Sequence, residues 1–134
     1  MFEPAVLNGL RVLVTGASGF IGSHLCARLV GLGAEVHGVS RAPSNDSSVS
    51  QWWQVTLDDE MATRSLVETV NPAVIFHLAS FVSGSRAIEH VMPALRSNLM
   101  STVNLLESAT ATGCQRIVLT GSLEETDVKS IRPW

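Results

Sequence analysis

The chain has 134 residues, of which 46% are hydrophobic and 16% are charged, and its formal net charge is −3. This length is typical of one domain, and the composition is too apolar for a disordered protein. The nine Lys and Arg residues are scattered singly from Arg11 to Arg132. Because nucleic-acid-binding proteins cluster their cations against phosphates, we expect no nucleic-acid partner.

The sequence shows neither a membrane-spanning run nor a secretory signal. No apolar run approaches the ~20 residues that a membrane-spanning helix needs, so we expect no membrane partner. The first residues lack the basic and apolar stretches of a secretory signal. Cys26 and Cys114 are far apart, with no second Cys or His at metal-ligand spacing. We therefore expect a reduced, cytoplasmic protein without a metal site.

Short runs rich in β-branched residues alternate along the chain with segments of helical spacing. The predicted strands are Leu10–Thr15, Glu35–Ser40, Trp53–Leu57, Ala73–Leu78 and Arg116–Thr120. The apolar stripes that predict helices are Ile21, Leu25, Leu29 and Leu32, then Met61, Leu66, Val67 and Val70, then Leu95, Leu99, Val103 and Leu106. These helices are expected to end at Gly31 or Gly33, at Asn71-Pro72 and at Gly113, and Asp58 or Asp59 to cap the second.

This alternation predicts an α/β fold. Nearly continuous apolar strands between helices indicate a doubly wound parallel sheet of five strands, with helices on both faces and the strand order 3-2-1-4-5. Residues 42–50, rich in Ser, are expected to form a surface loop. We expect residues 1–125 to form one domain and residues 126–134 an irregular tail.

Three glycines stand at spacing three between the first strand and the first helix. Gly16 can take the tight turn out of the strand, Gly19 lets the backbone approach a pyrophosphate, and Gly22 lets the helix pack closely. The helix then begins with free N–H groups and the positive end of its dipole facing the anion. Glycine also merely punctuates turns, but the strand before and the helix after favour dinucleotide binding.

The end of the second strand is where such folds read the adenosine ribose. An acid there binds the 2′-hydroxyl, whereas a nearby Arg accommodates a 2′-phosphate. This chain has Ser40 and Arg41, with no acid until Asp46. The pattern favours NADP over NAD, and the alternative is that Arg41 is only a solvated loop cation.

Four motifs together carry a resemblance to a known family. TGASGFIG at 15–22, FHLAS at 76–80, NLMSTVNLLESA at 98–109 and RIVLTGS at 116–122 resemble those of the extended short-chain dehydrogenase/reductases, the NAD-dependent epimerase/dehydratase group that acts largely on nucleotide sugars. The resemblance covers residues 9–125. It implies a Rossmann fold holding NAD or NADP, a catalytic set of Ser/Thr, Tyr and Lys, and often a homodimer built through helices.

The resemblance also implies roles for individual residues. Those it places at the cofactor, besides the glycines, are Phe20 and Ile21 at the pyrophosphate, Ser40 and Arg41 at the ribose, Leu78, Ala79 and Ser80 after the fourth strand with Phe81 beyond, and Asn98 opening the long helix. Ser122 matches the catalytic Ser/Thr that hydrogen-bonds the reacting oxygen. Thr56, before Leu57, stands where the family often has an acid that contacts the adenine.

Each of these sites also has a purely structural interpretation. His77, in an apolar strand, is expected to be a packed, hydrogen-bonded histidine and not a base. Asn98 fits a helix cap as well as a cofactor contact, and Ser122 fits an ordinary turn. Trp52 and Trp53 are expected to pack and not to stack on a base.

The tyrosine that the resemblance implies is missing. The sequence contains no Tyr, and its one lysine, Lys129, falls in the predicted tail. We therefore expect the chain to stop before the Tyr/Lys pair and the substrate lobe. Two hypotheses follow: the cofactor-binding part of an epimerase, dehydratase or reductase that works by reversible hydride transfer, or a free-standing, non-catalytic nucleotide-binding or regulatory module. An uncovered sheet edge and apolar helix faces also predict self-association.

Overall fold

The structure, a computed structural model, describes residues 7–44, 46 and 48–121. It contains one parallel sheet in the order β3-β2-β1-β4-β5, which confirms the predicted fold. The strands are β1 (Arg11–Thr15), β2 (Glu35–Ser40), β3 (Gln51–Gln54), β4 (Val74–His77) and β5 (Arg116–Leu119). All five strands therefore end at the same edge of the sheet, where doubly wound folds bind ligands.

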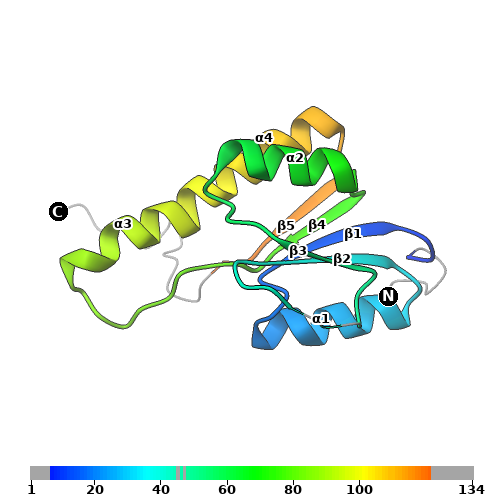
Figure 1. The fold of residues 1–134 in the computed structure, drawn as a ribbon, viewed down its shortest axis with the longest axis horizontal. Helices are drawn as coiled ribbons and strands as arrows, with labels where there is room; N and C mark the ends of the chain where they lie inside the picture. The colour runs from blue at the N-terminus through cyan, green and yellow to red at the C-terminus, as the bar shows by residue number, and fades with distance from the viewer. Residues whose placement is uncertain (1–6, 45, 47, 122–134) are drawn as a thin grey trace, which may run out of the picture.

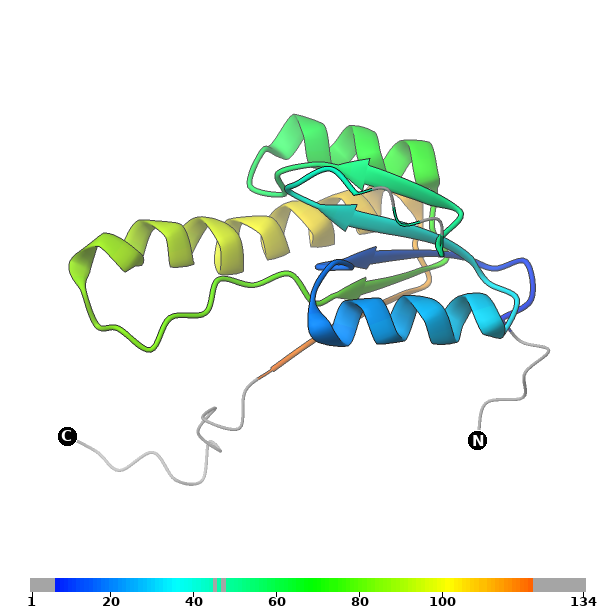
Figure 2. The same ribbon diagram turned by 60° about the horizontal axis from the view of Figure 1, so that its bottom comes forward.

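Helices cover both faces of this sheet. They are α1 (Phe20–Gly31), α2 (Glu60–Val70) and a longer helical segment made of η2 (Ile88–His90), α3 (Val91–Ala94), the π-helical η3 (Leu95–Met100) and α4 (Ser101–Thr112). Figure 1 shows α2 and α4 on one face and α1 on the other. In Figure 2 the α3 end of the long segment projects beyond the sheet. No helix among the described residues is long and apolar enough to cross a membrane.

Two apolar clusters hold these layers together. Leu13 and Ile75 pack toward α2 and α4, with Leu105 of α4 in the same cluster. Val12 and Val14 point to the opposite face and pack with α1. Successive residues of a strand alternate between the two faces, so a central strand buried on both must be apolar throughout.

The third strand lies earlier in the chain than the sequence predicted. β3 spans Gln51–Gln54 instead of residues 53–57, so Trp52 and Trp53 are strand residues. They pair with Gly38 and Val39 of β2 and pack on opposite faces of the sheet. Apolar runs gave the wrong boundary because the edge strand is short and its two tryptophans supply the packing.

The predicted stripe of α2 identified its buried face, since Leu66, Val67 and Val70 are buried, but the stripes predicted for the first and third helices largely did not. In α1 the buried residues are Gly22, Cys26 and Leu29, whereas Ile21 is 63% exposed. The stripe Leu95, Leu99, Val103 and Leu106 is exposed along its whole length. The buried face of α4 is made instead of the small or polar Ser101, Asn104, Ser108 and Ala109 together with Leu105.

The second helix follows its predicted signals. It begins after Asp59, whose carboxylate accepts a hydrogen bond from the Ala62 N–H at 2.9 Å. It ends at Asn71, which adopts the left-handed conformation with φ 45°. Of the two candidate caps, Asp59 is therefore the one used, and Asp58 is free to face the carboxyl edge of the sheet.

Candidate functional site

The site is built around the turn between β1 and α1. Gly16 has φ +66°, the left-handed region that L side chains rarely adopt. A Cβ at this position would lie 2.8 Å from the Ala79 nitrogen and 2.9 Å from the Leu78 carbonyl carbon. Only glycine lets the turn lie directly against the chain that leaves β4.

The other two glycines shape the start of α1. A Cβ at Gly22 would lie 2.1 Å from the Gly16 carbonyl oxygen, so this glycine lets the helix pack on the turn. Gly19 precedes the helix, and no side chain caps this end or places an acid in its first turn. The first N–H groups of α1 therefore have no intrahelical acceptor, and with the helix dipole they favour an anion.

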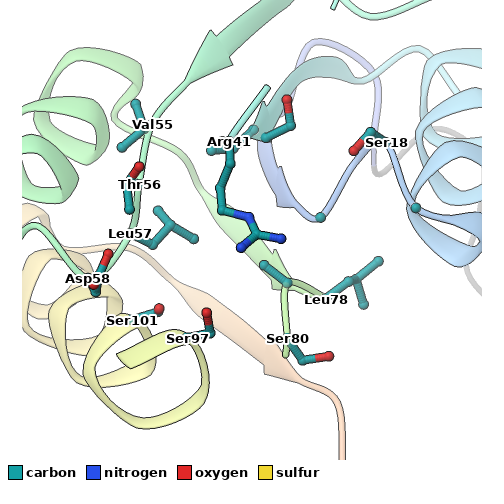
Figure 3. A pocket seen from close by; sticks show the side chains of 15 residues that line it. Ser18, Arg41, Val55, Thr56, Leu57, Asp58, Leu78, Ser80, Ser97 and Ser101 are labelled. Carbon is teal, nitrogen blue, oxygen red and sulfur yellow. The ribbon is translucent and has the colours of Figure 1, made fainter. Parts of the chain in front are cut away.

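A pocket of about 280 Å³ opens between this turn and the carboxyl ends of the strands (Figure 3). Its lining residues are Gly16, Ser18, Gly19, Val39, Ser40, Arg41, Val55, Thr56, Leu57, Asp58, Leu78, Ala79, Ser80, Ser97 and Ser101. They come from β2, the turn after β1, the segments that follow β3 and β4, and the long helical segment. Residues far apart in the sequence thus meet at one edge.

Most of the residues predicted at the cofactor line this pocket, and several do not. Those outside the lining are Phe20, Ile21, Gly22, Phe81 and Asn98. The Phe20 side chain is 82% exposed at the start of α1, and its carbonyl accepts from the His24 ring at 2.7 Å. The Phe20 side chain therefore does not form part of the pocket wall.

The wall after β3 is fixed by the carbonyl oxygen of Leu57. It accepts hydrogen bonds from Thr63 Oγ1 and from Asn104 Nδ2, both at 2.9 Å. Both donors are buried, so the bonds are shielded from water. They hold Thr56 and Asp58 against the pocket.

Arg41 is the lining residue that can reach furthest into the pocket. It follows β2 directly, and its guanidinium lies in the open space between Leu57 and Leu78 in Figure 3. The pocket also contains one acid, Asp58, on the wall beside Ser97 and Ser101. The end of β2 thus carries a cation, and the acid lies across the pocket from it.

Sequence patterns missed the two serines of the long helical segment. Ser97 lies within η3, and Ser101 follows it. A π-helical turn holds more residues than an α-helical one and shifts the side chains that follow it. Ser101 Oγ donates to the Arg96 carbonyl, five residues earlier, at 3.0 Å. No apolar spacing signals such a turn.

The resemblance implied that Asn98 opens the long helix, and the structure shows that it does not. The helical segment already begins at Ile88, and Asn98 lies inside η3. Its amide clamps the backbone of Phe81, because Oδ1 accepts from the Phe81 N–H at 2.7 Å and Nδ2 donates to the Phe81 carbonyl at 3.0 Å. The side chain therefore orders the segment that leaves β4.

His77 is buried, as expected, and its ring joins β1 to the long helix. Thr15 Oγ1 accepts from the Ala79 N–H at 3.2 Å, so its own proton is free to go to His77 Nδ1 at 2.7 Å. Nε2 then carries the ring proton and donates to Thr102 Oγ1 at 3.1 Å. Thr102 in turn donates to the Asn98 carbonyl at 2.7 Å. A neutral ring with its proton on Nε2 satisfies this chain of bonds.

Two further predictions concern the catalytic serine and a metal site. Ser122 lies outside the described residues. Among the residues that the structure describes, no three His, Cys, Asp or Glu side chains gather as a metal site would require. The arrangement provides an anion-binding turn, a cation at the end of β2 and a partly apolar cleft between them.

Comparison with known proteins identifies relatives of this chain. Residues 12–130 match the profile of the NAD dependent epimerase/dehydratase family. The chain is 34% identical over 122 residues to a UDP-glucose 4-epimerase from Mycolicibacterium smegmatis, covering 84% of this chain and 39% of the relative. It is 33% identical over 133 residues to an aldehyde reductase 2 from Sporidiobolus salmonicolor, covering 90% of this chain and 38% of the relative.

A solved structure gives the same result. The crystal structure of a UDP-glucose 4-epimerase from Thermus thermophilus in complex with NAD aligns with a TM-score of 0.72 at 29% identity, covering 81% of this chain and 36% of that one. The chain thus spans less than two fifths of the length of each of these three proteins.

The buried imidazole predicts how stability depends on pH. Burial lowers the pKa of His77 below its ordinary value of 6.5. Between 6.5 and the lower folded-state pKa, the unfolded chain binds a proton that the folded chain does not. The contribution of His77 to the free energy of unfolding should therefore be fully present above this window. It should be lost as the pH falls through the window.

Urea denaturation at several values between about pH 5 and pH 8 measures this dependence. The His77→Gln variant should be less stable than the wild type at neutral pH, and its unfolding free energy should fall less on acidification. Equal falls in the two proteins would contradict the assignment.

Proposed function

The chain belongs to the NAD dependent epimerase/dehydratase family, and on that premise we propose that its carboxyl-edge pocket binds a nicotinamide dinucleotide, with NADP preferred to NAD. We further propose that it is the cofactor-binding part of a protein that acts on a nucleotide sugar or a related carbonyl or hydroxyl compound by reversible hydride transfer. The names of its relatives support this, since they include UDP-glucose 4-epimerase and aldehyde reductase 2.

The observation that carries the proposal is the uncapped start of α1 at the pocket. Gly16 turns the backbone, Gly22 brings the helix onto the turn, and Gly19 leaves the N–H groups open. A pyrophosphate is the part of a dinucleotide that such a site suits. The partly apolar walls formed by Val39, Leu57 and the neighbouring residues suit the adenosine.

The preference for NADP rests on Arg41. Its guanidinium extends into the pocket from the end of β2 (Figure 3), where a ribose 2′-phosphate would lie. A guanidinium forms strong charge-assisted hydrogen bonds with a phosphate. The one acid of the lining, Asp58, comes from another segment, so the carboxyl end of β2 supplies no carboxylate for a 2′-hydroxyl.

The 134 residues contain no tyrosine, so binding rather than turnover is the activity that we propose for them by themselves. When bound, the dinucleotide supplies a hydride acceptor or donor. The residues that line the pocket orient it and exclude water from one of its faces. The second candidate, a non-catalytic nucleotide-binding or regulatory module, is favoured by the same missing tyrosine.

We also propose that two copies of the chain associate through the long helical segment. Leu95, Leu99, Val103 and Leu106 form one exposed apolar stripe along it. A stripe of this kind is costly in water and can pair with its own copy across a two-fold axis. A cytoplasmic location belongs to the same proposal and is supported by the free cysteines, Cys26 and Cys114.

Calorimetric titration with NADP and with NAD tests the cofactor proposal. The Arg41→Ala variant should bind NADP about ten- to hundredfold more weakly, the range for a lost hydrogen bond to a charged group. Its affinity for NAD should be nearly unchanged. An unchanged ratio of the two affinities would show that Arg41 does not select the cofactor.

A Gly19→Val variant tests whether the pyrophosphate binds at the turn. The new Cβ would approach the Gly16 carbonyl oxygen at 3.2 Å, a contact that needs only a small shift of the protein. It would nevertheless occupy the space over the turn, so both cofactors should lose affinity together. Retained binding of both would mean that the pyrophosphate does not lie there.

Sedimentation velocity tests the association. The wild-type chain should sediment as a dimer, and Leu99→Glu, in the middle of the exposed stripe, should sediment as a monomer. Met61 is also an exposed apolar residue, but it lies on α2, so Met61→Glu should remain a dimer. A wild-type monomer, or dissociation by both substitutions, would contradict the proposed surface.

A further inference from the structure

The segment that follows β2 is tied to the edge strand β3 by side chains as well as by the sheet. Trp52 Nε1 donates to Ser40 Oγ at 2.8 Å, and Gln54 Nε2 donates to the Arg41 carbonyl at 3.0 Å. The Val55 N–H donates to the Ser40 carbonyl at 3.0 Å. β3 thus contacts both residues that border the ribose side of the pocket.

Trp52 is itself held in place by the sheet. Its ring lies over Gly38, where an added Cβ would be 2.9 Å from two of the ring carbons. The strand pairing places Trp52 beside Gly38. The ring therefore has little freedom to move, and its Nε1–H is aimed at Ser40 by packing.

Ser40 passes this restraint on along the chain. Its hydroxyl accepts from Trp52 and donates its own proton to the Ala42 carbonyl. Since the hydroxyl has one proton, Ser40 cannot donate to a ribose while this bond persists. Ser40 thus fixes the turn on one side of Arg41, and Gln54 fixes the carbonyl of Arg41 itself.

A fixed backbone matters for a long side chain such as arginine. Ordering such a side chain on binding costs conformational entropy, and less is lost when its starting point is already fixed. The guanidinium of Arg41 extends into the pocket (Figure 3), while Ser40 and the Arg41 carbonyl are held by Trp52 and Gln54, which do not line it.

We propose that Trp52 and Gln54 are positioning residues that hold the segment 40–42 so that Arg41 meets a ribose 2′-phosphate, and that they thereby help set the preference for the phosphorylated cofactor. This inference rests on the proposed function. It assigns specificity to an edge strand whose side chains do not line the pocket.

The neighbouring tryptophan provides a matched control within the same strand. Trp53 Nε1 donates to His37 Nδ1 at 3.1 Å, on the face of the sheet that α2 and α4 cover. Trp53→Phe therefore removes the same kind of hydrogen bond as Trp52→Phe, from an adjacent residue, without touching the segment 40–42.

The experiment measures the affinities for adenosine 2′,5′-bisphosphate and adenosine 5′-monophosphate, which differ only in the 2′-phosphate. Gln54→Leu and Trp52→Phe should each reduce the affinity ratio about two- to tenfold, the factor that one hydrogen bond represents. Trp53→Phe should leave it unchanged. In an Arg41→Ala background, Gln54→Leu should have no further effect on the ratio, because it acts through the arginine.

The outcomes separate this inference from the proposal on which it rests. If Arg41→Ala lowers the ratio and Gln54→Leu does not, the positioning role is overturned and the cofactor preference stands. If Gln54→Leu lowers the ratio equally with and without Arg41, its effect is structural and the inference is also overturned. If Arg41→Ala leaves the ratio unchanged, the proposed cofactor preference is wrong, and the positioning role that depends on it is overturned as well. Gln54 is exposed, so its variant decides the question even if Trp52→Phe unfolds the chain.

Discussion

The close approach of two backbones at Gly16 is the constraint on which the rest of the site depends. The turn after β1 lies against the chain leaving β4, with no room for a Cβ between Gly16 and Ala79. This contact brings the start of α1, the end of β2 and the segment 78–80 to one edge of the sheet. A larger residue at Gly16 would clash with the backbone of Leu78 and Ala79 and force the turn away from it.

A second layer of contacts fixes the walls that this turn creates. Buried polar groups form these contacts. The hydrogen bond between Thr15 and His77 joins β1 to β4, and Asn104 donates to the carbonyl of Leu57. These side chains do not line the pocket. Their bonds lie in shielded surroundings, where a hydrogen bond is strong and an unpaired group is costly. The family membership of the chain and the geometry of its pocket thus both support the proposed dinucleotide site at this edge.

Much of this could be predicted from the sequence, because local signals and the sheet topology point the same way. Glycines between a strand and a helix, Asp59 at a helix start and the apolar strands all have direct physical meanings. The rest could not be predicted, since it depends on tertiary packing. The stripe through Leu99 is apolar yet exposed, and α4 instead buries small and polar residues such as Ser108. The π-helical turn that brings Ser97 to the pocket has no sequence signal of this kind.

The central claim is that the glycine turn and the strand ends around it bind a dinucleotide. Amide chemical shifts of the labelled chain, recorded during a titration with NADP, test it most directly. The account predicts saturable shifts at residues 18–22, 40–41 and 78–80. It also predicts that Gly9, Asn71 and Gly113, which border a separate pocket away from this site, do not respond. Shifts confined to those three residues, or none that saturate, would contradict it.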